Sequence, residues 1–260
     1  MTKAIQRITN KHKDNLINHE ERESIRLNKF ISDSGFCSRR EADRLIDEGR
    51  VTINGELATK GMQVFPNQIV KVDGDLIKPK STRVYIALHK PTGITTTNDL
   101  EIKNNIRDFV NYKEIIFPIG RLDKDSSGLI LLTNDGDIVN KILREEHGHD
   151  KEYIVSVDRE ITNDFINKMK NGVEIYNPVS RKYQVTNKCE VIKINKNTFK
   201  IILNQGLNRQ IRRMTKALKY NVKTLRRVRV MNIELNDLKV GEWRYLSTEE
   251  LNVMNELINK

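Results

Sequence analysis

The sequence predicts an α+β protein in which a small N-terminal helix–helix–β domain precedes a larger domain with a mixed, mainly antiparallel sheet. Two helical patterns and two hairpin signals follow one another within residues 25–80. After residue 82, several strand-like runs succeed one another without strict alternation with helices, which disfavours a doubly wound parallel sheet. A chain of 260 residues can bury two such cores. We therefore expect a disordered tail at 1–24, the small domain at 25–80 and the larger one at 83–258.

The composition excludes several classes of protein. No apolar run approaches the roughly 18 to 20 residues of a membrane span, and the N-terminus lacks the apolar region of a secretory signal, so a cytoplasmic location is expected. Cys37 and Cys189 are far apart and not at zinc-ligand spacing, which argues against a disulfide scaffold and a structural zinc. We also expect a monomer.

The small domain carries the clearest local signals. Leu27, Phe30 and Ile31 form one helical pattern, and a second begins at Ser38 with an S-x-x-E capping box and stops at Gly49. Asn54-Gly55 and Asp73-Gly74 then each predict a tight hairpin.

The larger domain alternates less regularly. Strand-like runs are expected at 85–88, 129–132, 152–157, 183–194 and 199–203. Helical patterns are expected at 136–146, 162–170 and 208–219, and a last helix starts at the capping box of Ser247 and Glu250.

The charge distribution points to a polyanionic partner. The chain has 46 Lys and Arg against 35 Asp and Glu, a net charge of +11. Residues 206–229 hold nine basic side chains and no acidic one. A solvated helix face usually mixes both signs, so this block favours a nucleic acid.

Residues 118–143, PIGRLDKDSSGLILLTNDGDIVNKIL, form the segment best suited to chemistry, because charged groups precede a buried strand. As a calcium loop the segment fails, since Asn134 stands where a bidentate Glu is needed. A polar turn in which Asp123 accepts backbone hydrogen bonds is the structural alternative. His147, His149 and Asp150 are a poor metal site because no fourth ligand is nearby, and no metal is expected. His89 follows a strand in a loop that is either a plain turn or an RNA contact.

The segment IRLNKFISDSGFCSRREADRLIDEGRVTINGE resembles the S4 RNA-binding domain. Ser38, Arg39 and Arg40 stand at a helix N-terminus, where free N–H groups and guanidinium groups suit phosphates. The resemblance also implies RNA contacts at Lys29 and Asn54.

The motif GRLDKDSSGLILLTNDG resembles the catalytic motif of the RNA pseudouridine synthases, in the branch that carries an S4 domain. KEYIV and QGLNRQIRRM match two further family segments, although Gly206 is followed by Leu207 where most relatives have Arg. A phosphate contact of that Arg is therefore lost or moved to Arg209. GLNRQIRRM and GEWRYL are most similar to members that act on 23S ribosomal RNA and have been linked to tRNA.

The resemblance implies a uridine isomerisation that needs no cofactor. Asp123 would start the reaction as nucleophile or base, with Arg212 as its charged partner. Arg121 would fill the space of the flipped base, and Tyr153 would stack on the uracil. Arg213 would face the RNA.

Two other functions were weighed against isomerisation. A non-catalytic RNA-binding or ribosome-associated protein would not need the catalytic motif together with Tyr153 and Arg212. A glycoside-type hydrolase needs two carboxylates that flank a bond, for which Asp123 and Asp125 are badly placed.

Overall fold

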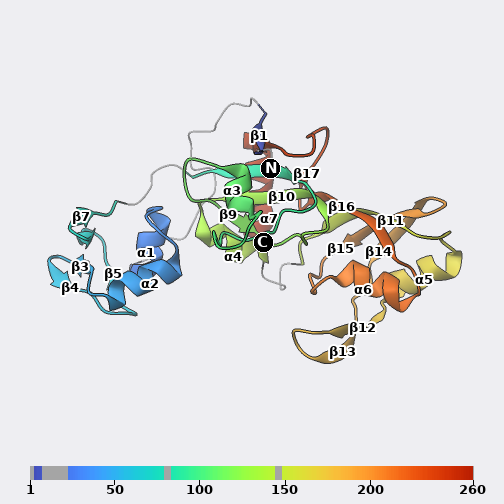
Figure 1. The fold of residues 1–260 in the computed structure, drawn as a ribbon, viewed down its shortest axis with the longest axis horizontal. Coiled ribbons are helices and arrows are strands. Elements are labelled where there is room, and N and C mark those ends of the chain that lie inside the picture. Colours follow the sequence, from blue (N-terminus) through green and yellow to red (C-terminus); the bar gives the residue numbers. More distant parts are fainter. Residues whose placement is uncertain (1–2, 8–22, 79–82, 144–147, 260) are drawn as a thin grey trace.

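A computed structural model describes residues 3–7, 23–78, 83–143 and 148–259. Figure 1 shows a small domain of residues 23–78 at one end and a long sheet with its helices at the other. No helix in these ranges is both long and apolar enough to cross a membrane.

The small domain confirms the predicted helices and hairpins. Helix α1 (Leu27–Asp33) and helix α2 (Arg39–Asp47) pack on four short paired strands: β4 (Glu56–Leu57), β3 (Val51–Ile53), β6 (Val70–Val72) and β7 (Asp75–Leu76). A further pair joins β2 (Ile25–Arg26) to β5 (Gln63–Val64). Both residues of the Asn54-Gly55 turn have positive φ, which is what a two-residue hairpin turn with the correct twist requires.

The large domain is built on a ten-stranded sheet in the order β1-β18-β8-β10-β16-β11-β15-β14, with β9 beside β10 and β17 beside β16. Its strands are β1 (Ile5–Gln6), β8 (Tyr85–Lys90), β9 (Phe117–Ile119), β10 (Ser127–Thr133), β11 (Lys151–Val157), β14 (Glu190–Asn195), β15 (Thr198–Leu203), β16 (Val222–Val230), β17 (Ile233–Glu234) and β18 (Glu242–Tyr245). The pairs β10–β16 and β1–β18 are parallel and the other pairs are antiparallel. The expected mixed, mainly antiparallel sheet is therefore confirmed.

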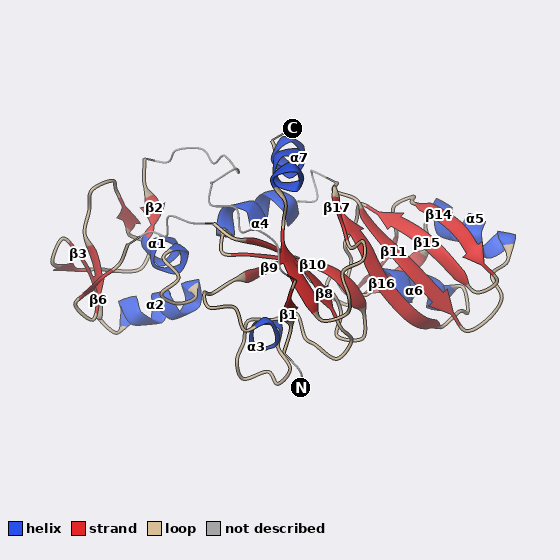
Figure 2. Ribbon diagram, turned by 90° about the horizontal axis from the view of Figure 1, so that it is seen from above, coloured by secondary structure: helices blue, strands red, loops and turns tan. Residues whose placement is uncertain are grey.

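Helices cover both faces of the central strands (Figure 2). Helices α4 (Gly136–Leu143) and α7 (Thr248–Ile258) lie on one face, and α3 (Ile106–Val110) lies on the other. Alternate residues of β8 and β10 enter the two cores: Leu129 and Leu131 face α4 and α7, whereas Ile130 and Leu132 face α3. A third core lies under α5 (Asn163–Asn171) and α6 (Gln210–Ala217).

Two strand predictions need correction. The run 183–194 is not one strand, because β13 (Lys182–Val185) pairs with β12 (Glu174–Asn177) in a separate hairpin, and β14 joins the large sheet. The second half of the basic block was not predicted as a strand, yet it forms β16 in the middle of the sheet.

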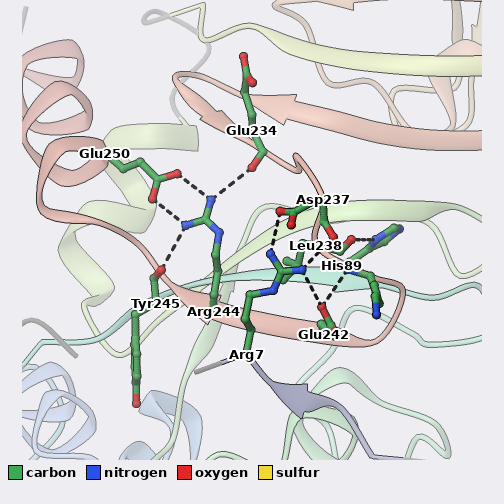
Figure 3. Close-up of polar contacts among 10 residues, drawn as sticks. Arg7, His89, Glu234, Asp237, Leu238, Glu242, Arg244, Tyr245 and Glu250 are labelled. Atoms are coloured by element: carbon green, nitrogen blue, oxygen red, sulfur yellow. Dashed lines mark hydrogen bonds and ion pairs between the residues drawn. The ribbon is translucent and has the colours of Figure 1, made fainter. Parts of the chain in front are cut away.

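The predicted tail at 1–24 is wrong for residues 4–7, and residues 8–22 lie outside the described ranges. Strand β1 pairs with β18, and the Arg7 guanidinium contacts Asp237 at 2.7 Å and Glu242 at 3.2 Å (Figure 3). Backbone pairing and these non-local carboxylates order a segment whose own sequence has no strand pattern.

The two domains meet where α1 approaches the first turn of α4. Residue Lys29 is 8% exposed, and its ammonium contacts Asp33 on its own helix and Asp137 on α4, the latter at 3.1 Å. Burial raises the pKa of the Asp33 carboxyl, and Lys29 opposes that shift. Lys29 thus takes part in the contact between the domains, and RNA binding by this residue stays a prediction.

A close approach of two backbones in the sheet, at Gly128, yields a prediction about stability. Gly128 has φ +112°, and a Cβ there would lie 2.2 Å from the carbonyl oxygen of Arg227 on β16. We expect Gly128→Ala to lower the free energy of unfolding by about 2–5 kcal/mol, from steric overlap and backbone strain. Urea denaturation measures the loss.

Gly241→Ala is the matched control, since Gly241 has φ +84° but a Cβ there would meet only the Phe109 ring, at 3.8 Å. We expect it to cost about 1–2 kcal/mol, the strain of the left-handed conformation alone. Equal losses in the two variants would contradict the steric argument.

Candidate active site

The 121–126 loop connects β9 to β10 and is fixed by backbone hydrogen bonds. Within the loop, the N–H of Ser126 donates to the carbonyl of Asp123 at 3.0 Å. The N–H of Gly93 donates to the carbonyl of Lys124 at 2.7 Å, and the buried Thr96 hydroxyl donates to the carbonyl of Leu122 at 2.7 Å. The backbone of Asp123 is therefore held on both sides, while its side chain remains 33% exposed.

Arg227 on β16 ties this loop to the sheet from beneath. Its side chain is buried, with Nε donating to the carbonyl of Leu129 at 2.7 Å and Nη1 to the carbonyl of Arg121 at 3.3 Å. One guanidinium thus bonds the loop and the strand that follows it.

Asp125 is the centre of the ion pairs at this loop. Arg209 makes two contacts with its carboxylate, at 2.9 and 2.7 Å, and lies 3.8 Å from Asp123. Arg212 donates to the carbonyl of Asp125 at 2.9 Å and to the Ser126 hydroxyl at 3.1 Å. The hydrogen bond from Arg209 lowers the pKa of Asp125, and burial lowers the pKa of Arg212.

A pocket opens beside these groups. It is lined by Arg121, Asp123, Tyr153 and Arg212, which are the residues that the sequence assigned to the reaction. Arg209 also lines the pocket, and Leu203 and Leu225 add apolar wall. The structure thus brings together side chains from the loop, β11 and α6, as a site for a flipped base requires.

The charged partner of Asp123 differs from the expected one. Within the described ranges, Asp123 forms an ion pair with Arg209, whereas Arg212 contacts Asp125 and Ser126. Arg209 has φ +51° at the start of α6, and this backbone turn has no signal in the sequence.

Some of the residues expected to bind RNA are exposed, whereas others make contacts within the protein. Arg39 and Arg40 are exposed at the start of α2, where the Ser38 hydroxyl caps the helix by accepting from the N–H of Glu41 at 3.2 Å. Asn54 uses its side-chain oxygen within the hairpin, accepting from the N–H of Ile69 at 2.8 Å.

Arg213 and His89 are used inside the protein. Arg213 donates to Asn208 and to the carbonyl of Tyr176 at 3.2 Å, so these contacts hold α6 to β12. His89 is buried, and its Nδ1 lies 2.7 Å from the carbonyl oxygen of Leu238, so it is not an RNA contact.

Sequence reasoning missed Lys90, which follows His89. Its side chain is fully buried, and its ammonium donates to the carbonyls of Pro91 at 2.8 Å and Ile94 at 3.0 Å. A lysine that ends an apolar strand was a possible signal, since burial of this residue type needs partners. Lys90 supports the loop segment that receives the 121–126 loop.

No group of three or more His, Cys, Asp or Glu is arranged for a metal ion in the part of the chain that the structure describes. His147 lies outside that part.

Comparisons with known proteins agree with this arrangement. Residues 84–217 match the family described as RNA pseudouridylate synthase, and residues 25–77 match the S4 domain. The chain is 53% identical over 237 residues to the dual-specificity RNA pseudouridine synthase RluF of Escherichia coli strain K12, covering 90% of this chain and 80% of the relative.

Two further matches are more distant. The chain is 33% identical over 239 residues to ribosomal large subunit pseudouridine synthase B of Bacillus subtilis, covering 89% and 96% of the two chains. A crystal structure of a pseudouridylate synthase aligns with a TM-score of 0.65 and 26% identity, covering 89% of this chain and all of the other.

Lys90 predicts a pH dependence of stability. Burial lowers the pKa of its ammonium from 10.5 to about 8. Between these values the unfolded chain holds the proton and the folded chain does not, so rising pH stabilises the fold through this group. We expect the unfolding free energy of the wild type minus that of Lys90→Met to rise by up to about 3 kcal/mol from pH 8 to 10.5.

Urea denaturation of both proteins across this pH range measures the difference, in which other titrating groups cancel. A difference that stays constant with pH would show that Lys90 titrates normally.

Proposed function

We propose, from the premise that the chain belongs to the RNA pseudouridylate synthase family, that it converts a uridine of 23S ribosomal RNA, and also of tRNA, to pseudouridine. The observation that carries this proposal is that Arg121, Asp123, Tyr153 and Arg212 line one pocket. The name of the Bacillus subtilis relative supports the RNA of the large ribosomal subunit as the substrate, and the name of the Escherichia coli relative, a dual-specificity enzyme, supports a second RNA substrate.

The reaction is an isomerisation, so atoms balance within the substrate. The N1–C1′ bond breaks, the uracil turns, C5 joins C1′, and the proton lost from C5 is balanced by one gained at N1. Asp123 starts this sequence, by attack on C1′ or by removing a sugar proton. The Arg209 guanidinium lies 3.8 Å from the Asp123 carboxylate and supplies positive charge beside the reacting group.

The pocket walls supply the remaining roles. Tyr153 and the apolar side chains of Leu203 and Leu225 offer a surface on which a flipped uracil stacks. Arg121 is exposed at the rim, where its guanidinium can occupy the space that the base vacates. Arg212 braces the loop through Asp125 and Ser126.

The S4 domain adds a second RNA contact. Arg39 and Arg40 present two exposed guanidinium groups at the start of α2. We further propose that the chain acts as a monomer in the cytoplasm.

The first test replaces the carboxylate. Asp123→Asn keeps the side-chain shape but supplies neither a nucleophile nor a base, so we expect no pseudouridine in an unmodified 23S rRNA transcript from Escherichia coli. Carbodiimide adducts mapped by primer extension report the product. Asp125→Asn, which loses only the contacts that brace the loop, should retain product at a rate reduced about tenfold.

Product formation by Asp123→Asn would remove this residue from the reaction. RNA binding without modification by the wild type would instead favour a docking protein.

The second test concerns the S4 contact. Each phosphate contact that is removed should lower the slope of log affinity against log salt by about one, so Arg39→Gln and Arg40→Gln should each flatten the response. Arg44→Gln is the control on the same helix, because Arg44 already pairs with Glu41 and Glu48. Filter binding of the same transcript over a salt series measures the slopes, and three equal slopes would contradict the S4 contact.

A further inference from the structure

The β12–β13 hairpin, residues 174–185, is separate from the large sheet. Figure 1 shows it projecting beneath α6, and its strands pair with each other alone among the described strands. Its contribution to the buried core is small, because Ile175 is the one hydrophobic residue of either strand within the core clusters. A projecting element with little core is a candidate for binding.

The base of the hairpin is rigid. The N–H of Val173 donates to the Thr186 hydroxyl at 3.0 Å, and the N–H of Thr186 donates to the carbonyl of Val173 at 3.1 Å. Gly172 has φ +94°, and a Cβ there would lie 2.3 Å from the carbonyl oxygen of Thr186. The two chain segments are therefore held close together where the hairpin leaves the domain.

Two contacts connect the hairpin to the wall of the pocket. Arg213 of α6 donates to the carbonyl of Tyr176 at 3.2 Å, and its neighbour Arg212 lines the pocket. The N–H of Asn187 donates to the side-chain oxygen of Gln205 at 3.2 Å, and Gln205 is another lining residue. The hairpin is thus fixed in place relative to the site of reaction.

The outer face of the hairpin exposes an aromatic pair. Tyr176 and Tyr183 are directly opposite in the register, and their ring centroids are 5.3 Å apart in an edge-to-face arrangement. They are 42% and 71% exposed, and Val185 on the same face is 62% exposed. Aromatic rings gathered on a surface in this way indicate a binding surface.

The hairpin has a small excess of positive charge, which suits RNA as the ligand. Residues 174–185 carry Arg181 and Lys182 against Glu174, all three are exposed, and Arg181 lies in the turn next to the strand that holds Tyr183. Basic side chains beside stacking aromatics are the combination that binds single-stranded nucleic acid.

We propose that this hairpin holds an unpaired nucleotide of the RNA substrate near the target uridine, with its base stacked on Tyr183 and its phosphate beside Arg181 in the adjoining turn. The proposal rests on the proposed function for the identity of the ligand. It adds a substrate contact outside the pocket and outside the S4 domain.

Binding is measured in the Asp123→Asn protein, so that the transcript stays unmodified. Loss of base stacking in Tyr183→Ala should raise the Kd for the Escherichia coli 23S rRNA transcript by about 5-fold to 150-fold. Tyr183→Phe keeps the ring and should stay within about twofold of the parent, whereas Tyr183→Leu keeps apolar area without the ring and should bind like Tyr183→Ala.

The matched control is Ile194→Ala, at a 51% exposed apolar residue of β14 on the edge of the large sheet, which should leave the Kd unchanged. Equal melting temperatures show that each variant folds. A Kd of Tyr183→Ala equal to that of the parent protein overturns the proposal; a hairpin that binds a protein would also give this result. A Kd of Tyr183→Leu equal to that of the parent protein overturns it too, because apolar area without an aromatic ring would then be sufficient.

The experiments distinguish a failure of the proposed reaction from a failure of the hairpin contact. If the unmutated chain forms no pseudouridine while Tyr183→Ala still loses affinity, the hairpin contact stands and the assigned reaction does not.

Discussion

The close parallel contact between β10 and β16 is the constraint on which the pocket depends. At Gly128 the two backbones approach too closely for a side chain, and Arg227, the residue directly opposite Gly128, extends its side chain to the 121–126 loop. The position of the loop that carries Asp123 is therefore fixed relative to strands β10 and β16. A buried guanidinium bonded to main-chain carbonyls sets the geometry of a site whose own side chains are partly exposed.

The basic side chains of residues 206–229 have two roles: some make contacts within the protein, and others are exposed to bind RNA. Within the basic block, Arg227 and Arg229 bond internal carbonyls and Glu152, and Arg209 pairs with Asp125. These residues shape the pocket, and their acidic partners lie far away in the sequence. Four other basic side chains of the block are exposed and can meet phosphates: Lys216, Lys219, Lys223 and Arg226.

Local patterns predicted local structure well. The capping box of Ser247 and Glu250 and the Asn54-Gly55 turn each depend on neighbouring residues, and the structure confirms them. At Ser38 the structure confirms one half of the predicted box, because the Ser38 hydroxyl accepts from the N–H of Glu41. The set of residues in the pocket was available from a long motif. The partners of Lys29 and Arg213 were not, because Asp137 and Tyr176 are brought to them by tertiary packing. For the same reason, a basic run could not be read as the central strand β16, since its burial depends on strands from elsewhere in the chain.

Because strand β1 belongs to the large sheet, the S4 domain is connected to the large domain by two chain segments instead of one. The chain leaves the large sheet after Arg7, forms the small domain, and enters the sheet again at Tyr85. The small domain is thus topologically an insertion with two tethers. A double tether confines the domain to a smaller volume and raises its effective concentration near the pocket. It also means that a single cut in either connection would leave the two domains linked through the other, with β1 acting as an anchor held by the edge of the sheet.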